Sequence, residues 1–232
     1  DHDDIILSPI LEDAYNIFEK DEEIGFVYSD FINMYEDGRD FSYKMSKIFG
    51  KGYTGYYKRK FNNKWLSVCV CPGINNITTS HLVCLPNHPR IWRKKTLLEL
   101  GNYSEFLPIC DDFEILMRTM CNTKIAKIHK AGYIQFMNDN ANNFSLIRNS
   151  EINRLGPYHI QPQFYRKYDV NAVMQNKDSY EDEKYINGYR SNIWKRNNYD
   201  NKICNITVNN DFDKQYCLIG FETLFIKNVK EL

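Results

Sequence analysis

The pattern of apolar and polar positions predicts that helices and strands alternate along the amino-terminal part of the chain. Ser8-Pro9, followed by two acids in the next turn, predicts a helix that runs to about Lys20. A hydroxyl cap, an early proline and acids near the positive end of the helix dipole are typical of a helix start. The apolar run 24–28 then predicts a buried strand that ends at Ser29-Asp30, and Asp37-Gly38 predicts a turn.

The next segments are interpreted as a loop, a strand and an irregular stretch. Residues 50–64 are rich in Gly, Tyr, Lys and Arg, and we expect a long loop there. Its basic and aromatic side chains could contact a phosphate or a sugar, although a solvated loop is the simpler interpretation. Trp65 to Cys71 alternates as a strand does, with Cys69 as a small core residue. Residues 72–90 contain three prolines and are expected to be irregular.

Two helices and two short strands are expected after this stretch. Residues 94–100 form a short helix closed by Gly101. Residues 111–120 form a longer helix with an apolar face and three acids in its first turn. Residues 124–128 and 133–136 are predicted as two separate short strands.

The pattern weakens towards the carboxyl end. The segment 175–202 is polar, whereas 215–229 regains apolar character and is expected to pack back on the body. Strands that alternate with helices predict an α/β domain with a mixed sheet over residues 1–148. Residues 149–232 are predicted to form an accessory extension.

Composition and charge exclude several classes of protein. The 232 residues are 43% hydrophobic, which allows a sizeable core, and Lys+Arg and Asp+Glu both number 30. Zero net charge argues against a general nucleic-acid binder, which needs a basic excess. No apolar run approaches a membrane span and no signal-like segment is visible, so a cytoplasmic location is expected unless an upstream segment carries a signal. Homo-oligomerisation is left open.

Seven cysteines, an odd number without a Cys-x-x-Cys pair, do not predict a zinc site. Reduced thiols are therefore expected. The chain lacks an initiator Met and opens on packed acids directly before a helix start. This opening predicts that the sequence begins inside a domain, with an upstream segment missing.

The first four residues, Asp1-His2-Asp3-Asp4, are the most informative chemical feature. Asp1 and Asp3 project from the same face of an extended segment. Neighbouring carboxylates repel one another unless a cation or a proton lies between them. A divalent metal that carries phosphate oxygens would suit this segment. A frayed acidic terminus explains the same four residues without any function.

A second acidic site, Asp111-Asp112, opens the helix predicted over 111–120. Acids at this position are ordinary partners of the helix dipole. An aspartate at a helix start that faces a cleft can also act as a general base. A metal site and a separate base together suffice to transfer a group from a nucleoside diphosphate.

The order of these motifs resembles family 2 glycosyltransferases of the GT-A fold. Those enzymes carry an Asp-x-Asp motif at a strand end, then a Tyr-Ser-Asp-like run, a basic-apolar stretch before a Gly-Gly-aromatic turn, and an acidic-aromatic stretch that ends in Arg. The resemblance spans roughly residues 1–147. The matching segments are Asp1-His2-Asp3-Asp4, Val27-Tyr28-Ser29-Asp30, residues 93–103 and residues 111–118.

The resemblance implies a donor site that depends on Mn²⁺ or Mg²⁺. Asp3 would bind the metal that holds the donor diphosphate, Asp1 would bind that metal or the donor ribose, and Asp4 would share in the site. Trp92 and Arg93 would lie near the acceptor or the diphosphate.

The resemblance also implies the catalytic residues. Asp112 matches the family's catalytic base, with Asp111 beside it. The family's reaction is an inverting single displacement at the anomeric carbon of the sugar.

Several departures from the family pattern qualify these assignments. Gly101-Asn102 replaces the usual Gly-Gly, and Asn138 and Asn140 stand where Arg and His are expected. The third metal ligand is therefore open between Asp139, Asn140 and His129, with a plain surface or strand-end histidine favoured for His129. The family's first nucleotide-binding half would precede Asp1. The region after Asn149 resembles the accessory tail of glycosyltransferases from large DNA viruses.

The leading hypothesis is a metal-dependent inverting glycosyltransferase that moves a hexose from a nucleotide sugar, a UDP-sugar above all, to a hydroxyl of a glycan or protein. The alternative is a catalytically degenerate transferase that binds a glycan or a partner. A third class is a metal-dependent phosphohydrolase or nucleotidyltransferase that uses the same acids.

Overall fold

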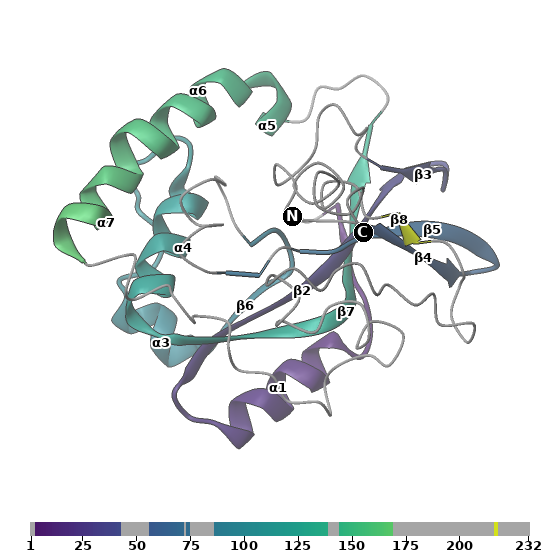
Figure 1. Ribbon diagram of the computed structural model, residues 1–232, viewed down its shortest axis with the longest axis horizontal. Helices are drawn as coiled ribbons and strands as arrows, with labels where there is room; N and C mark the ends of the chain where they lie inside the picture. Colours follow the sequence, from purple (N-terminus) through teal and green to yellow (C-terminus); the bar gives the residue numbers. More distant parts are fainter. Residues whose placement is uncertain are drawn as a thin grey trace, which may run out of the picture.

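A mixed β-sheet forms the centre of the molecule, and its two longest strands pair in parallel (Figure 1). These are β2 (Ile24–Tyr35) and β7 (Lys124–Met137). In the computed structural model, the described residues form an eight-stranded sheet in the order β1-β7-β2-β5-β4-β8, and β3 and β6 also pair with β2. The predicted α/β class with a mixed sheet is confirmed. The described residues are 3–42, 56–71, 73–74, 86–138, 144–168 and 216–217.

The shorter strands pair antiparallel with their neighbours, and the helices lie between and after them. The shorter strands are β1 (Ile5–Ile6), β3 (Asp40–Phe41), β4 (Tyr56–Phe61), β5 (Lys64–Cys69), β6 (Arg90–Trp92) and β8 (Tyr216–Cys217). The helices are α1 (Ile10–Lys20), α3 (Lys94–Glu99), α4 (Asp111–Asn122), α5 (Phe144–Ile147), α6 (Asn149–Leu155), the π-helical segment η2 (Gly156–Ile160) and α7 (Gln161–Lys167).

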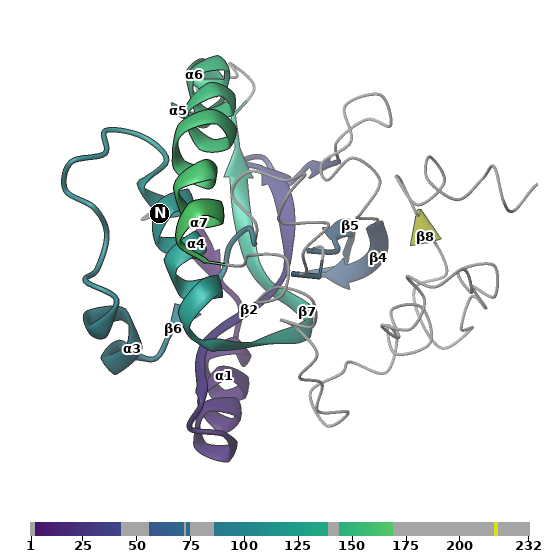
Figure 2. The same cartoon turned by 60° about the vertical axis from the view of Figure 1, so that its left-hand side comes forward.

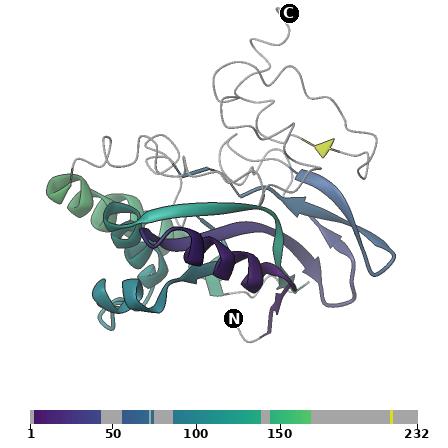
Figure 3. The same cartoon turned by 90° about the horizontal axis from the view of Figure 1, so that it is seen from below.

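Helix α1 covers one face of the parallel pair (Figure 3). Its buried residues Ile10, Ala14 and Ile17 recur at intervals of four and three, which aligns them on one side of the helix. They pack against Val27 of β2 and against alternate residues of β7. This contact fixes the position of the segment that precedes α1.

The opposite face of the sheet carries α4 and the carboxyl-terminal helices (Figure 2). Phe26 and Tyr28 of β2 pack there against Phe113 and other apolar residues of α4. Ile160 and Phe164 enter the same cluster from η2 and α7. Residues 149–168 of the expected accessory extension therefore share a hydrophobic core with α4.

The helix starts and ends in the structure lie close to the positions predicted from sequence. Helix α1 begins where expected, but the predicted hydroxyl cap from Ser8 is wrong, because Pro9 occupies the cap position and no side chain caps the helix. Helix α3 ends at Glu99 with Leu100 as its cap, followed by Gly101 at φ +86°, and α4 continues to Asn122. The Asp37-Gly38 turn is confirmed by the bond from the Gly38 amide to the Tyr35 carbonyl.

The long loop predicted over 50–64 is wrong for residues 56–64. Strands β4 and β5 form a hairpin there, with full pairing from Tyr56–Cys69 to Phe61–Lys64. The turn consists of Asn62 and Asn63, both at positive φ (45° and 63°), which asparagine tolerates and which matches the twist of a two-residue hairpin. Residues 50–55 lie outside the described residues.

The two short strands predicted over 124–128 and 133–136 are one continuous strand, β7. Gly132 lies in its middle because α1 and β2 approach closely there. A Cβ on Gly132 would lie 2.4 Å from the Ser29 hydroxyl oxygen and 2.6 Å from Ile10 Cγ1. The glycine therefore makes room for packing and does not break the strand.

Strand β2 also runs further than predicted, past Asp30 to Tyr35. Asp30 is fully buried there, and its Oδ1 accepts a bond from the Cys71 amide (2.9 Å) and lies 3.5 Å from Lys127 Nζ. Such a pair is compatible with a strand interior because each buried charge has an opposite partner.

The cysteines of the described core behave as expected from the sequence. Cys69 and Cys71 are fully buried in the core, Cys110 is also buried and Cys121 is partly buried, and none of the four forms a disulfide with a described residue. No helix among the described residues has the length and apolar character to cross a membrane. Of the carboxyl-terminal segment 215–229, β8 is described and pairs with β4, while the polar segment 175–202 lies outside the described residues.

Candidate functional site

The candidate site is built around Arg90, a residue of β6 that sequence patterns did not single out. Its side chain is 5% exposed. Nη1 donates to Oδ2 of Asp112 at 2.9 Å, and Nε donates to the carbonyl of Pro86 at 2.9 Å. A guanidinium stays charged when it is buried, so a carboxylate partner stabilises it. The pairing of β6 with β2 at Tyr28 places Arg90 beside the start of α4.

Asp112 lies in the first turn of α4 with its carboxylate held at both oxygens. Oδ2 accepts from Arg90, and Oδ1 accepts from the Phe113 amide at 2.7 Å. Cys110, which precedes the helix, adopts a left-handed conformation (φ 59°) and turns the chain sharply into α4. The Asp112 side chain remains 34% exposed, so a ligand can reach it.

Asp4 joins the amino-terminal segment to β7. Its Oδ2 accepts from the Tyr133 hydroxyl at 2.7 Å, and its Oδ1 accepts from the Phe136 amide at 2.8 Å. Burial, followed by the hydrogen bond and charge of Asp4 and the charge of Asp3, raises the pKa of Tyr133. The phenol therefore stays protonated and serves as a fixed donor to Asp4.

His88 stacks on Tyr133 from the segment that leads into β6. The ring centroids are 5.3 Å apart and the planes differ by 22°. Burial, and then the nearby charge of Arg90, lower the pKa of His88 to about 4, against a smaller opposing effect of Asp112. The imidazole is therefore neutral at pH 7.

These contacts bring the two predicted acidic sites to one place. Arg90 acts electrostatically on Tyr133, together with Asp3 and Asp4, and on His88, together with Asp112. The acidic segment before α1 and the acidic start of α4 therefore flank the same residues, although more than a hundred positions separate them in the chain. We call this group the Arg90 cluster: Asp4, His88, Arg90, Asp112 and Tyr133.

Asp111 and the thiol of Cys110 directly precede Asp112 in the chain. Burial, together with the charges of Asp112 and Asp111, raises the pKa of Cys110 to about 11. A thiol in that state is a poor nucleophile at neutral pH. A carboxylate is therefore the better base on this side of the site.

The structure describes two of the three predicted metal ligands. Asp3 is exposed and Asp4 is half-buried, while Asp1 lies outside the described residues. Within the described residues, no group of three His, Cys, Asp or Glu side chains is arranged to hold a metal ion. Mg²⁺ is commonly bound by one or two carboxylates together with substrate phosphates, so an exposed Asp3 next to Asp4 fits the chemistry of such an ion.

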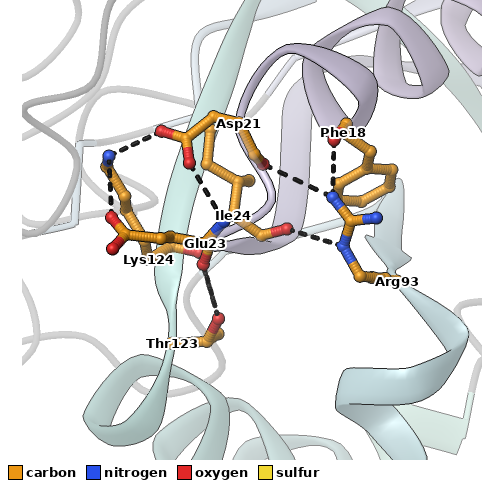
Figure 4. A network of polar contacts seen from close by, with 7 residues as sticks. All are labelled: Phe18, Asp21, Glu23, Ile24, Arg93, Thr123 and Lys124. Atoms are coloured by element: carbon orange, nitrogen blue, oxygen red, sulfur yellow. Dashed lines mark hydrogen bonds and ion pairs between the residues drawn. The ribbon is translucent and has the colours of Figure 1, made fainter.

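Arg93 and Trp92 are engaged within the fold. The Arg93 guanidinium donates to the carbonyls of Phe18 (2.6 Å), Ile24 (3.2 Å) and Asp21 (3.4 Å), at the end of α1 (Figure 4). Trp92 Nε1 donates to the Thr119 hydroxyl at 2.9 Å. These contacts give no support to the predicted role of either residue beside the acceptor or diphosphate, which stays a prediction from the resemblance.

Of the three candidates for the third metal ligand, the structure describes only His129. His129 is 5% exposed within β7, so it is neither a surface nor a strand-end residue. Asp139 and Asn140 lie outside the described residues. The altered Gly101-Asn102 pair is fixed by Arg118, whose guanidinium donates to the Asn102 carbonyl at 2.6 Å.

Sequence patterns missed Arg90, His88 and Tyr133. Arg90 did carry a signal, because an arginine beside apolar residues in a short strand calls for a buried acidic partner. The sequence did not identify that partner, because Asp112 lies 22 positions away. His88 and Tyr133 carried no such signal, because their role depends on contact across the sheet.

In comparisons with protein-family models, curated proteins and solved structures, no match to this chain was found. A family assignment therefore does not follow from these comparisons. Function is inferred below from the chemistry of the Arg90 cluster and from the motif resemblance.

Proposed function

We propose that this protein is a metal-dependent inverting glycosyltransferase with a GT-A-type domain. In this proposal it moves a hexose from a nucleotide sugar, with UDP-sugars as the first candidates, to a hydroxyl of a glycan or protein. The observation that carries the proposal is the convergence of two acidic segments on the Arg90 cluster. One segment contributes Asp3 and Asp4, and the other contributes Asp112.

Asp112 has the geometry of a general base in this proposal. Its carboxylate pairs with Arg90, is oriented by two hydrogen bonds and remains partly exposed. It would accept the proton of the attacking hydroxyl. The hydroxyl oxygen forms a bond to the anomeric carbon while the bond from that carbon to the diphosphate oxygen breaks. The electron pair leaves with the nucleoside diphosphate, so the step balances.

Asp3 would hold the divalent metal, with Asp1 and Asp4 nearby. Mn²⁺ or Mg²⁺ bound there would supply positive charge to the leaving diphosphate. Tyr133 fixes Asp4 through its hydroxyl, which keeps that carboxylate at the end of the acidic segment. The contribution of the chain is therefore to hold its carboxylates at set positions around the donor.

One observation favours the alternative of a degenerate, binding-only protein. Both oxygens of Asp112 already accept hydrogen bonds, and an ion pair with a buried arginine weakens a base. In this alternative the Arg90 cluster recognises a glycan or partner without turnover. The two functions differ in their need for a metal-bound donor.

The test is release of nucleoside diphosphate by the full chain from a panel of nucleotide sugars with Mn²⁺. Asp112→Asn should lower kcat by roughly 10²–10⁴-fold, the usual contribution of a general base. The control is Asp37→Asn, which removes a carboxylate that is exposed and paired with Arg39 in a surface turn. This control should leave kcat unchanged.

The outcomes separate the candidate functions. Absence of turnover with every donor, or full activity of Asp112→Asn, would rule out the transferase. Calorimetric glycan binding without metal or donor would then support the binding module. Release of phosphate or pyrophosphate in place of nucleoside diphosphate would indicate a phosphohydrolase or nucleotidyltransferase.

A further inference from the structure

The two ring nitrogens of His88 are in different environments. Nδ1 is buried and has no hydrogen-bond partner among the described residues. Nε2, in contrast, is not a buried atom without a partner. No described contact occupies Nε2, and the residue is half-buried. The ring therefore has one polar atom closed off inside the protein and one at the accessible edge of the Arg90 cluster.

This asymmetry predicts the position of the ring proton. A neutral imidazole carries one N–H donor and one acceptor nitrogen. A buried N–H without an acceptor is among the rarest arrangements in proteins, and an unused acceptor is tolerated better. The proton is therefore expected on Nε2, where solvent or a ligand can accept it.

The ring is also held in a fixed position. It stacks on Tyr133, and the Tyr133 hydroxyl is bonded to Asp4. Among the described residues, the charged groups that act on the ring are Arg90 from β6 and Asp112 from α4, and Asp4 is bonded to the Tyr133 on which the ring stacks. The ring that carries Nε2 is therefore supported by Tyr133 and lies within the electrostatic influence of Arg90 and Asp112.

We propose that His88 contacts the ligand directly, by donating a hydrogen bond from Nε2 to a phosphate oxygen of the nucleotide sugar. This inference rests on the proposed function for the identity of the ligand. A neutral donor suits this place because it adds no charge to the pairing of Arg90 with Asp112. A metal held near Asp3 would then supply the positive charge for the phosphate.

The experiment is ¹⁵N NMR of the histidine rings in the full chain, with diamagnetic Mg²⁺. The free protein should show the Nε2–H form of His88 at neutral pH. Inorganic pyrophosphate and UDP, each with Mg²⁺, should both shift the Nε2 resonance, whereas free glucose should not. A shift with glucose alone would assign the contact to the sugar and overturn the phosphate assignment.

Two variants separate the hydrogen bond from the ring stack. His88→Phe keeps an aromatic ring on Tyr133 and removes the donor, and it should weaken pyrophosphate binding about tenfold or more, the effect of one hydrogen bond to a charged group. His88→Gln places an amide N–H near the position of Nε2 and should recover part of the affinity. Equal affinity of wild type and His88→Phe would overturn the inference.

The remaining outcomes are also decisive. A resting Nδ1–H form, or binding of no phosphate ligand at all, would overturn the inference. Shifts with pyrophosphate and UDP but no turnover with any nucleotide sugar would leave His88 as a phosphate contact and reject the transferase. Turnover that is unaffected in His88→Phe would keep the transferase and reject the role of His88.

Discussion

Two arginines three positions apart make opposite use of their charge. Arg93 lies at the end of α1 and donates to the backbone carbonyls of Phe18, Asp21 and Ile24. Arg90 donates to a side-chain carboxylate, Asp112, that stays partly exposed. The first arrangement ties elements together, and the second holds a reactive group in place.

The two arginines also differ in how completely the polar groups around them are paired. Around Arg93, Asp21 pairs with Lys124 at 2.6 Å and Glu23 accepts from Lys124 at 3.5 Å, so the charges are matched by opposite ones (Figure 4). We call this group the Arg93 network. In the Arg90 cluster, Nδ1 of His88 is buried without a partner among the described residues. A buried polar atom without a partner is costly and therefore needs an explanation, of which contact with a ligand is one.

The largest effect is expected from breaking the Arg90 cluster. Arg90→Met removes the cation that orients Asp112, and small misplacement of a catalytic group costs on the order of 10²-fold in rate. We expect a loss of kcat of about that size, with a smaller change in KM for the donor. Arg90→Lys keeps the charge without the guanidinium fork and should recover part of the rate. Wild-type kcat in Arg90→Met, measured by release of nucleoside diphosphate, would contradict a role in positioning.

The matching change in the Arg93 network should act on stability. Arg93→Met removes three hydrogen bonds from a guanidinium to carbonyls. Bonds of this kind contribute roughly 1.5–3 kcal/mol each at most, and they are not additive, so a loss of about 2–3 kcal/mol in the free energy of unfolding is expected. Urea unfolding followed by circular dichroism measures it. If kcat per folded molecule falls as far as in Arg90→Met, the distinction between the two arginines fails.

A smaller effect concerns the pH dependence of stability. Burial keeps the pKa of His88 at about 4 in the folded protein, below the value near 6.5 of an unfolded chain. Between these values the unfolded state binds more protons, so stability should fall as pH drops from about 6.5 to about 4. One such group contributes at most about 1.4 kcal/mol per pH unit.

The variant that tests this is His88→Phe, which should flatten the dependence in urea unfolding across that pH range. His159→Gln serves as control because His159 is an exposed histidine on η2. An equal flattening in both variants, or in neither, would show that His88 is not held neutral by the fold.

The smallest effect is expected at the exposed edge of the Arg93 network. Lys124 is 40% exposed, and its hydrogen bond is the main cause that lowers the pKa of Asp21. Lys124→Met should cost less than about 1 kcal/mol, as for other pairs near the surface. Because the folded pKa of Asp21 is lowered, this contribution is present above the unfolded value and is lost as pH falls through the folded value. A loss as large as that of Arg93→Met, in urea unfolding at neutral pH, would contradict this ranking.

Helix starts and ends could be predicted from sequence because their causes are local. Pro9, Gly101 and Asp111-Asp112 act on the backbone within a few residues, and α1, α3 and α4 lie close to the predicted positions although Ser8 does not cap α1. The hairpin of β4 and β5 also had a local signal, the Asn62-Asn63 pair. The composition of residues 50–64 obscured it.

The strand lengths and the site could not be predicted in the same way, because their causes lie far apart in the chain. Gly132 makes room for Ile10 and Ser29, and β2 continues past Asp30 as it pairs with β7 up to Tyr35. Sequence indicated both acidic segments of the candidate site. The place of Arg90 between them was found only from the structure, in which β6 pairs with β2.

The central claim is that the Asp3-Asp4 segment and the start of α4 form one site around Arg90. Its most direct test is paramagnetic broadening of ¹⁵N-labelled full chain by Mn²⁺ with UDP, against Mg²⁺ with UDP as the diamagnetic reference. Metal bound at Asp3 should broaden the His88 ring and the Phe113 amide together, leave the Lys124 amide less affected, and lose this effect in Asp3→Asn. Broadening that spares both His88 and Phe113, or that persists in Asp3→Asn, would show that the two acidic segments do not share a site.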